Sequence, residues 1–262
     1  MSDDLVIGIQ HHLKASGLGW NIIHLPVTDS TNDVAKSAAQ DGAEEGLVVL
    51  ADRQTAGRGR MGRTWHGSGG SLLMSLLLRP SFPPSRIFAL TMLSATAIRE
   101  AVCNVCGLRC DLKWPNDLLL RGKKLGGILT EASFRGEQID YAIVGIGLNI
   151  NLDVREYPDI SDIATSLSAE LGRPLDRGEF LGEILGQIAI RYGWAQRGEL
   201  NLIHQEWRSA LAHLGRSVSV VDRGQVLQGI AEDVDTEGTL IVRRRDGALV
   251  RVVTGDVSLV PE

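Results

Sequence analysis

Hydrophobic and polar positions recur along the chain with two different periods, which predict where strands and helices lie. Apolar runs and period-two alternation predict strands over residues 20–27, 47–51, 71–78, 108–114, 117–121, 125–134 and 139–150. Apolar residues at helical spacing predict helices over residues 3–16, 31–41, 85–105, 165–171, 178–196 and 201–213. Ser30 and Asp33 form a capping-box pattern at the start of the second helix. Residues 1–214 are therefore expected to form an α+β domain, a mixed sheet with flanking helices.

The last part of the chain, residues 215–262, has a different pattern. Short β-rich runs over residues 217–221, 226–234, 239–245 and 248–253 alternate with turns such as Glu237-Gly238 and Asp246-Gly247. They predict a second domain, a small barrel of hairpins. Because a domain of this size buries too little apolar surface to be stable alone, we expect it to dock on the larger one.

Composition and charge narrow the class of protein. Of the 262 residues, 44% are hydrophobic and 23% are charged, which is typical of a globular protein with a sizeable core. No apolar run is long enough to span a membrane, so we expect no membrane partner. The net charge of -5 argues against a nucleic acid partner. The chain has three cysteines, Cys103, Cys106 and Cys110, and this odd number does not suggest the disulfide framework of a secreted protein. The N-terminus lacks a signal-peptide pattern, so we expect a cytoplasmic protein.

The segment from Gln54 to Trp65 has the clearest chemistry. Three arginines alternate with three glycines there: Arg58, Arg60 and Arg63 with Gly57, Gly59 and Gly62. Glycine lets a backbone approach a ligand closely, and guanidinium groups pair with carboxylate or phosphate oxygens, so the loop is predicted to bind small anions. The letters also match the dinucleotide-binding fingerprint, but the residues that follow cannot start the helix this fingerprint requires. An RNA-binding tail is a second alternative, although the loop lies between two apolar strands.

Two further segments combine charge with glycine. In residues 108–114 the apolar Leu108, Cys110, Leu112 and Trp114 share one face, and Arg109, Asp111 and Lys113 share the other. Pro115 ends this strand, and Asn116-Asp117 follows as a turn. The strand after it begins with Lys123 and Lys124 and contains Gly126-Gly127, a pair that indicates a bulge or the close approach of a ligand.

The strand over residues 139–150 repeats this glycine pattern with period two. Ile146, Leu148 and Ile150 point to one face, while Gly145, Gly147, Asn149 and Asn151 point to the other. A flat ligand could lie on the bare face, and a crossing helix would favour glycine equally, so both interpretations stay open here.

Taken together, these segments resemble the biotin protein ligases, the biotin–acetyl-CoA-carboxylase ligase family. The resemblance is carried, in the family's order, by Asp29 to Asn32, Gln54 to Trp65, Lys113 to Leu118, Lys124 to Leu129 and Gly145 to Asn151. It implies a catalytic domain like that of class II aminoacyl-tRNA synthetases and an SH3-like C-terminal barrel. It also implies an ATP-dependent enzyme that makes biotinyl-5'-AMP and transfers biotin to a lysine of a biotin carboxyl carrier domain.

The resemblance also implies roles for single residues. For the ureido head of biotin it implies Ser30, Thr31, Asn32 and Gln54, and for the loop that closes over carboxylate and phosphate it implies Arg58, Gly59 and Arg60. For the wall of the biotin pocket it implies Gly127, Leu129, Gly145 and Gly147, and for the nucleotide side Arg60, Arg63, Trp65, Asn116 and Asn149. Lys124 is expected to bridge the carboxylate and the α-phosphate, with Lys113 as its rival, and Arg60 to be the main phosphate contact. Asp117 is expected to orient the carrier lysine or to anchor Lys124.

Other expectations follow from the same resemblance. Mg²⁺ should accompany ATP, and a homodimer is compatible with the family. Some members carry an N-terminal DNA-binding domain, but only about 20 residues precede the first predicted strand, so we expect a form without that domain and without repressor activity. The alternative function is lipoate or octanoate attachment on a related fold.

Overall fold

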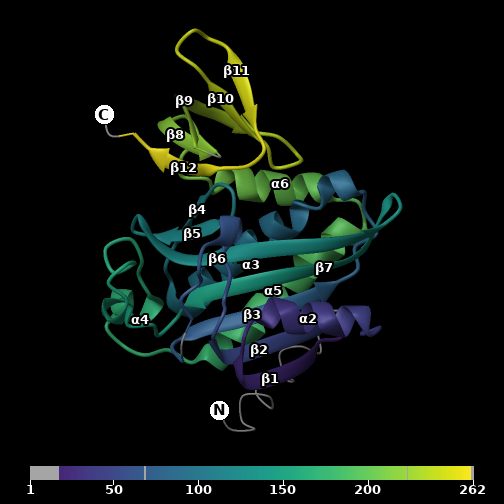
Figure 1. Ribbon diagram of the computed structural model, residues 1–262. Coiled ribbons are helices and arrows are strands. Elements are labelled where there is room, and N and C mark those ends of the chain that lie inside the picture. The colour runs from purple at the N-terminus through teal and green to yellow at the C-terminus, as the bar shows by residue number, and fades with distance from the viewer. Residues whose placement is uncertain (1–17, 68, 223, 261–262) are drawn as a thin grey trace.

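The computed structural model describes residues 18–67, 69–222 and 224–260, and the helix predicted over residues 3–16 lies outside them. A larger α+β part carries a small sheet on one side (Figure 1). The strands of the larger part are β1 (Asn21–Thr28), β2 (Leu47–Gln54), β3 (Ser71–Leu78), β4 (Asp111–Lys113), β5 (Asp117–Leu120), β6 (Lys123–Arg135) and β7 (Gln138–Asn149). Its helices are α2 (Thr31–Gln40), α3 (Ala89–Cys106), α4 (Leu167–Leu171), α5 (Arg177–Gln196) and α6 (Leu200–Ser209).

The larger part is built on a mixed sheet, as predicted. Its strand order is β1-β2-β3-β7-β6-β5-β4, with β1 and β2 parallel and the other neighbouring pairs antiparallel. The strand predicted over residues 108–114 is shorter than expected, because only Asp111–Lys113 pairs with β5. The predicted alternation still holds where it matters: Leu112 and Trp114 are buried while Asp111 is exposed.

Helices cover both faces of the sheet at β2 and β3. Val48 and Leu50 belong to the large core that includes α3, α5 and α6, whereas Leu47 and Val49 pack in a second cluster with α2. All eight residues of β3 are buried, which explains its continuous apolar sequence. Each fully buried leucine of such a strand contributes about 1.5–3 kcal/mol. The helices α3 and α5 therefore hold one face of the sheet in place, and α2 holds the other.

The ends of two helices differ in how well the sequence predicts them. Helix α3 ends at Gly107, whose φ of 66° is the left-handed conformation that glycine adopts without strain. The prediction of a capping box at the start of α2 is wrong, because the side chain of Ser30 makes no capping hydrogen bond there. Asp33, the other member of the pattern, instead accepts two hydrogen bonds of 2.6 Å from Arg58. Asp33 therefore forms an ion pair with a residue distant in the sequence, where the capping box predicted a local hydrogen bond.

The C-terminal part is a five-stranded antiparallel sheet in the order β11-β10-β9-β8-β12. Its strands are β8 (Ser217–Asp222), β9 (Gln225–Val234), β10 (Leu240–Arg243), β11 (Leu249–Val252) and β12 (Asp256–Leu259). The first four form the predicted hairpins, but β12 was not predicted and pairs with β8, far away in the sequence. The predicted domain boundary between residues 214 and 215 stays a prediction, and β8 begins shortly after it.

The small sheet docks on the larger part, as expected. Trp114 is 1% exposed, and its indole N–H donates to the carbonyl of Gly238 over 2.8 Å. Val218, Val220, Val242 and Val257 of the small sheet belong to the same core as α3 and the central sheet. A shared core fixes how the two parts sit relative to one another. Separately, none of the helices in the described ranges is both long and apolar enough to cross a membrane.

Candidate functional site

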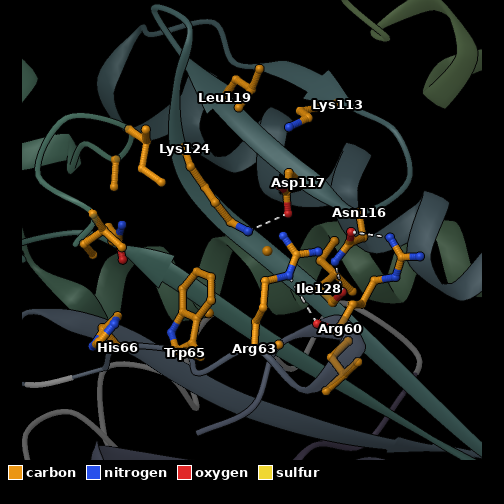
Figure 2. A pocket seen from close by; sticks show the side chains of 18 of the residues that line it. Arg60, Arg63, Trp65, His66, Lys113, Asn116, Asp117, Leu119, Lys124 and Ile128 are labelled. Atoms are coloured by element: carbon orange, nitrogen blue, oxygen red, sulfur yellow. Dashed lines mark hydrogen bonds and ion pairs between the residues drawn. The ribbon is translucent and has the colours of Figure 1, made fainter. Parts of the chain in front are cut away.

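A cavity of about 640 Å³ lies where the central sheet meets the C-terminal sheet. Its walls come from the start of α2, the loop after β2, strands β4 to β7, the segment around residues 160–164, and β12. Figure 2 shows part of this lining. Every residue that the sequence pointed to lines this one cavity: Ser30, Thr31, Asn32, Gln54, Arg58, Gly59, Arg60, Arg63, Trp65, Lys113, Asn116, Asp117, Lys124, Gly127, Leu129, Gly145, Gly147 and Asn149. The fold therefore brings together segments as far apart in the sequence as Ser30 and Asn149.

One end of the cavity carries neutral hydrogen-bonding groups. Gln54, at the end of β2, accepts hydrogen bonds from both the backbone N–H and the hydroxyl of Thr31, over 2.7 and 3.0 Å. Ser75 of β3 donates to the Thr31 hydroxyl and to the Asn32 amide oxygen, over 2.7 and 2.6 Å. Thr31, Asn32 and Ser75 are buried and Gln54 is half-buried, so their mutual hydrogen bonds hold these side chains in fixed orientations. Such an end suits an uncharged polar ligand group.

The loop after β2 is folded back on itself. Gly59 N–H donates to the carbonyl of Arg63 over 2.7 Å, and Trp65 N–H donates to the carbonyl of Gly57 over 2.9 Å. The reversal between them includes Met61, whose φ of 55° is unusual for a residue with a side chain. This backbone points the three arginines of the loop at different partners.

Each of these arginines has a distinct environment. Arg58 donates two hydrogen bonds to Asp33, and Arg63 donates two to Asp256 of β12, over 2.8 and 2.7 Å. Arg60 makes only long contacts to neutral oxygens, over 3.3 Å to Asn116 and 3.4 Å to the carbonyl of Gly255. Arg58 and Arg63 are thus neutralised by neighbouring carboxylates, which leaves Arg60 as the loop cation that faces the cavity.

Arg60 carries a charge that the protein itself does not pair closely. Within the described residues no carboxylate lies within ion-pair distance of its guanidinium. Burial lowers the pKa of Arg60 from its ordinary value, and the more distant Asp256 and Asp117 partly oppose this shift. The group remains a cation at neutral pH, since arginine does not lose its proton in proteins. A partly desolvated, unpaired guanidinium is a strong binding group for an anion.

Lys124 and Asp117 form the second charged feature. Lys124 Nζ lies 2.7 Å from the Asp117 carboxylate and 5.4 Å from the centre of the Trp65 ring (Figure 2). Strand β5 pairs with β6 with a register shift opposite Leu125, so the bulge that Gly126-Gly127 indicated is present. Lys113, the rival lysine, lies on β4 farther along the cavity wall. The Asp117 contact and the bulge place Lys124 beside the glycines, as the sequence argument required.

The glycine face of β7 is covered by the protein's own side chains. A Cβ atom on Gly145 would lie 2.2 Å from the amide oxygen of Asn32, and one on Gly147 would lie 2.3 Å from the Trp65 ring. Asn32 stands at the start of α2 and Trp65 at the end of the arginine loop. Of the two open interpretations, close packing of a helix against glycine holds at Gly145, while Trp65 forms a wall of the cavity at Gly147.

Asn149 lies deeper in the same cavity. It is 3% exposed, and its amide nitrogen donates to the carbonyl of Thr165 over 3.1 Å. That bond fixes the orientation of the amide, and the Asn149 oxygen finds no donor among the described residues. A fixed, buried acceptor facing a cavity is suited to a ligand N–H.

Some residues that line the cavity come from distant segments and were not predicted from the sequence. His66 pairs with Asp159 over 2.6 Å, which ties the arginine loop to the segment before α4. Asp256 lines the cavity from β12, and His213 lines it from the segment that leads into the C-terminal sheet. No pattern in their own segments indicated a site. The only available signal was the expectation that the small sheet docks.

Comparison with known proteins agrees with this geometry. Residues 24–149 match the Biotin/lipoate A/B protein ligase family, and residues 213–260 match the Biotin protein ligase C terminal domain. The chain is similar to the Bifunctional ligase/repressor BirA of Bacillus subtilis, with 36% identity covering 96% of this chain and 78% of that protein. It is also similar to the Biotin–[acetyl-CoA-carboxylase] ligase of Paracoccus denitrificans, with 34% identity covering 85% of this chain and 94% of that protein.

A solved structure shares the fold over nearly its whole length. The structure of biotin protein ligase from Aquifex aeolicus in complex with biotin and ATP has a TM-score of 0.78 and 30% identity, covering 92% of this chain and 99% of that one. The resemblance found in the sequence is confirmed, as is the α+β fold with its small C-terminal β domain. The identity to these relatives extends across both parts of the chain, so this protein belongs to the biotin protein ligase family.

Proposed function

We propose that this ligase activates biotin with ATP as biotinyl-5'-AMP and transfers the biotinyl group to a lysine of a biotin carboxyl carrier domain. One observation carries the proposal: a single cavity joins a neutral, hydrogen-bonding end to a cationic end that contains Arg60 and Lys124. The ureido ring of biotin needs the neutral hydrogen-bonding end. The cationic end is needed where the biotin carboxylate meets the triphosphate of ATP. The proposal includes the domain boundary at 214/215, a cytoplasmic location and compatibility with a homodimer.

In the first step, a biotin carboxylate oxygen attacks the α-phosphorus of ATP. The new bond joins that oxygen to phosphorus, and the bond to the β-phosphate oxygen breaks with its electron pair leaving on pyrophosphate. Two anions must be held within reacting distance, which costs free energy unless cations offset their repulsion. Arg60 and Lys124 are the two cations proposed for this task, and Gly127, Leu129, Gly145 and Gly147, with Gly59 and Arg58, enclose the biotin.

In the second step, the amine of the carrier lysine attacks the activated carbonyl carbon and AMP leaves. The attacking nitrogen gains a bond to carbon, the bond from that carbon to the phosphate oxygen of AMP breaks, and the proton of the nitrogen passes to a base or to solvent, so a nearby carboxylate that orients the N–H favours the reaction. Asp117 is suited to this role because its contact with Lys124 places it beside the reacting groups. The same contact supports a role for Asp117 in fixing Lys124 before the carrier arrives.

The nucleotide is proposed to occupy the part of the cavity near Asn149 and Trp65. The unpartnered oxygen of Asn149 can accept a hydrogen bond from the exocyclic amine of adenine. The indole N–H of Trp65 also has no partner among the described residues. Arg63 and Asn116 border the path from this region to Arg60, so the phosphates would pass along these side chains.

Magnesium is expected to accompany ATP. In residues 18–67, 69–222 and 224–260 no three His, Cys, Asp or Glu side chains gather as metal ligands. Mg²⁺ commonly binds through substrate phosphates and water with few protein ligands. The steps above accordingly use only the chain's own residues.

The test is a complete reaction with defined products. The full chain is incubated with ATP, biotin and a carrier domain, pyrophosphate release is followed, and the carrier is examined by mass spectrometry. We expect one biotinyl group on one lysine and one pyrophosphate for each transfer. Lipoate or octanoate accepted in preference to biotin would replace the proposal by the alternative function, and absence of any product would refute both. Retention on polynucleotide with strong salt dependence would contradict the expected lack of a nucleic acid partner.

A further inference from the structure

His213 lies where the chain passes from the larger part into the C-terminal sheet. The backbone N–H of Leu112 donates to the carbonyl of Ala210 over 2.9 Å, and Ala212 N–H donates to the carbonyl of Leu112 over 3.0 Å. The joining segment therefore runs beside β4, which carries Lys113. His213, Lys113 and Ser258 of β12 all line the cavity.

The imidazole of His213 is buried with both ring nitrogens unsatisfied. The residue is 3% exposed, and neither nitrogen has a hydrogen-bond partner among the described residues. A buried polar group without a partner destabilises the folded protein, so each such group calls for an explanation. Because His213 also lines the cavity, a ligand is the natural source of the missing partner.

The charges around His213 indicate what kind of ligand this is. Burial, and secondly the charge of Lys113, lower the pKa of His213 to about 4, so the ring is neutral near pH 7 and offers one N–H donor. Within the described residues Lys113 has no carboxylate within ion-pair distance. Two of the carboxylates that line the cavity are already engaged, Asp117 by Lys124 and Asp256 by Arg63. An ammonium beside a neutral donor attracts an anion and repels a protonated amine.

We propose that His213, together with Lys113, binds the β- and γ-phosphates of ATP and holds pyrophosphate as it leaves. This inference rests on the proposed adenylation. When the bond between the α-phosphorus and the bridging oxygen breaks, the electron pair stays on that oxygen, and negative charge grows on pyrophosphate. The N–H of His213 and the ammonium of Lys113 stabilise this charge by hydrogen bonds, and neither group transfers a proton.

The test compares nucleotides that differ only in the terminal phosphates. ATP and AMP are titrated by calorimetry into the full chain saturated with biotinol, an alcohol that cannot form the acyl phosphate. Since a hydrogen bond to a charged group contributes about 1.5–3 kcal/mol, His213→Phe should weaken ATP binding by about tenfold to a hundredfold. AMP binding should change by less than about twofold on the same reasoning. Lys113→Gln should show the same selective loss, and His213→Asn, which keeps a donor, should recover part of it.

A matched control is available at the same junction. His204 of α6 contacts the carbonyl of Val234 over 3.1 Å and does not line the cavity, so His204→Gln should leave both affinities unchanged. Equal affinities of the wild type and both His213 and Lys113 variants for ATP would overturn the inference, as would an equal loss for AMP. Slower transfer from preformed biotinyl-5'-AMP at unchanged ATP affinity would assign His213 to the carrier step instead. If the wild type bound no ATP, the proposed function itself would fail.

Discussion

Gly147→Ala tests whether the Trp65 wall of the cavity depends on a bare position in β7. The added Cβ would lie 2.3 Å from ring atom Cε2 of Trp65 and 2.6 Å from its indole nitrogen, well inside van der Waals contact. Gly147 pairs with both Leu73 and Gly127 in the middle of the sheet, so its backbone cannot move away easily. The indole must therefore shift, and the wall that it forms is lost.

The expected cost follows from this overlap. Forcing extra atoms into a packed site typically costs about 1–3 kcal/mol. For a chain of this size each kcal/mol lowers the melting temperature by about 2–4 °C, so Gly147→Ala should lower it by roughly 2–12 °C. Because the displaced ring borders the proposed biotin pocket, the affinity for biotin should fall as well.

The assay is a double-mutant cycle read by thermal unfolding and by biotin titration. In a Trp65→Ala background the clash is absent, so the further change Gly147→Ala should cost far less than it does in the wild type. Gly186→Ala is the matched control, because a Cβ on this glycine of α5 meets nothing within 4 Å. An equal cost of Gly147→Ala with and without the indole would refute the reasoning.

Four further outcomes are expected. Arg60→Ala should slow pyrophosphate release at least about a hundredfold, as for loss of one charge-stabilising group, while Arg243→Ala on the C-terminal sheet should not. Asp256→Ala should lower the KM for ATP, because Arg63 is then no longer neutralised, yet change the free energy of unfolding by at most about 1 kcal/mol, because that ion pair is partly exposed. The free energy of unfolding should decrease as the pH falls from 6.5 through about 4, because His213 binds a proton more readily in the unfolded chain. The full decrease from this group should be roughly 3 kcal/mol. The variant His213→Phe should lack this contribution. Burial raises the pKa of Cys110 to about 12, so iodoacetamide at pH 8 should alkylate it only after unfolding, as mass spectrometry of the peptides would show.

Local patterns in the sequence predict much of this fold. The period-two alternation of Ile146, Leu148 and Ile150 determines which face of β7 is buried, and the continuous apolar run of β3 predicts a strand covered on both sides. Gly107 marks the end of α3 because glycine adopts a positive φ without strain. These features depend on neighbours in the chain, so one sequence suffices to predict them.

The sequence could predict many of the residues that line the candidate site, but not which of the charged residues there pair with one another. Arginine between glycines indicates anion binding wherever the loop lies, yet it does not say that Arg58 and Arg63 pair with carboxylates while Arg60 stays unpaired. The capping box failed for the same reason, since Asp33 gains more from a distant guanidinium than from its own helix end. An ion pair is set by which side chains the packing brings within a few ångström.

Only the tertiary structure reveals the contribution of the C-terminal sheet. Strand β12 is four residues long and pairs with β8, so its own sequence carries too weak a pattern to predict it. His213 looks like an ordinary residue of a connecting segment until the fold buries it beside Lys113 in the cavity. The sequence by itself predicted most strands and helices of the described residues, and it pointed to the arginine loop, because hydrophobic period and side-chain chemistry act locally. The pairing of charges and the closure of the cavity were decided by packing, because they depend on groups that come together only when the shared core forms.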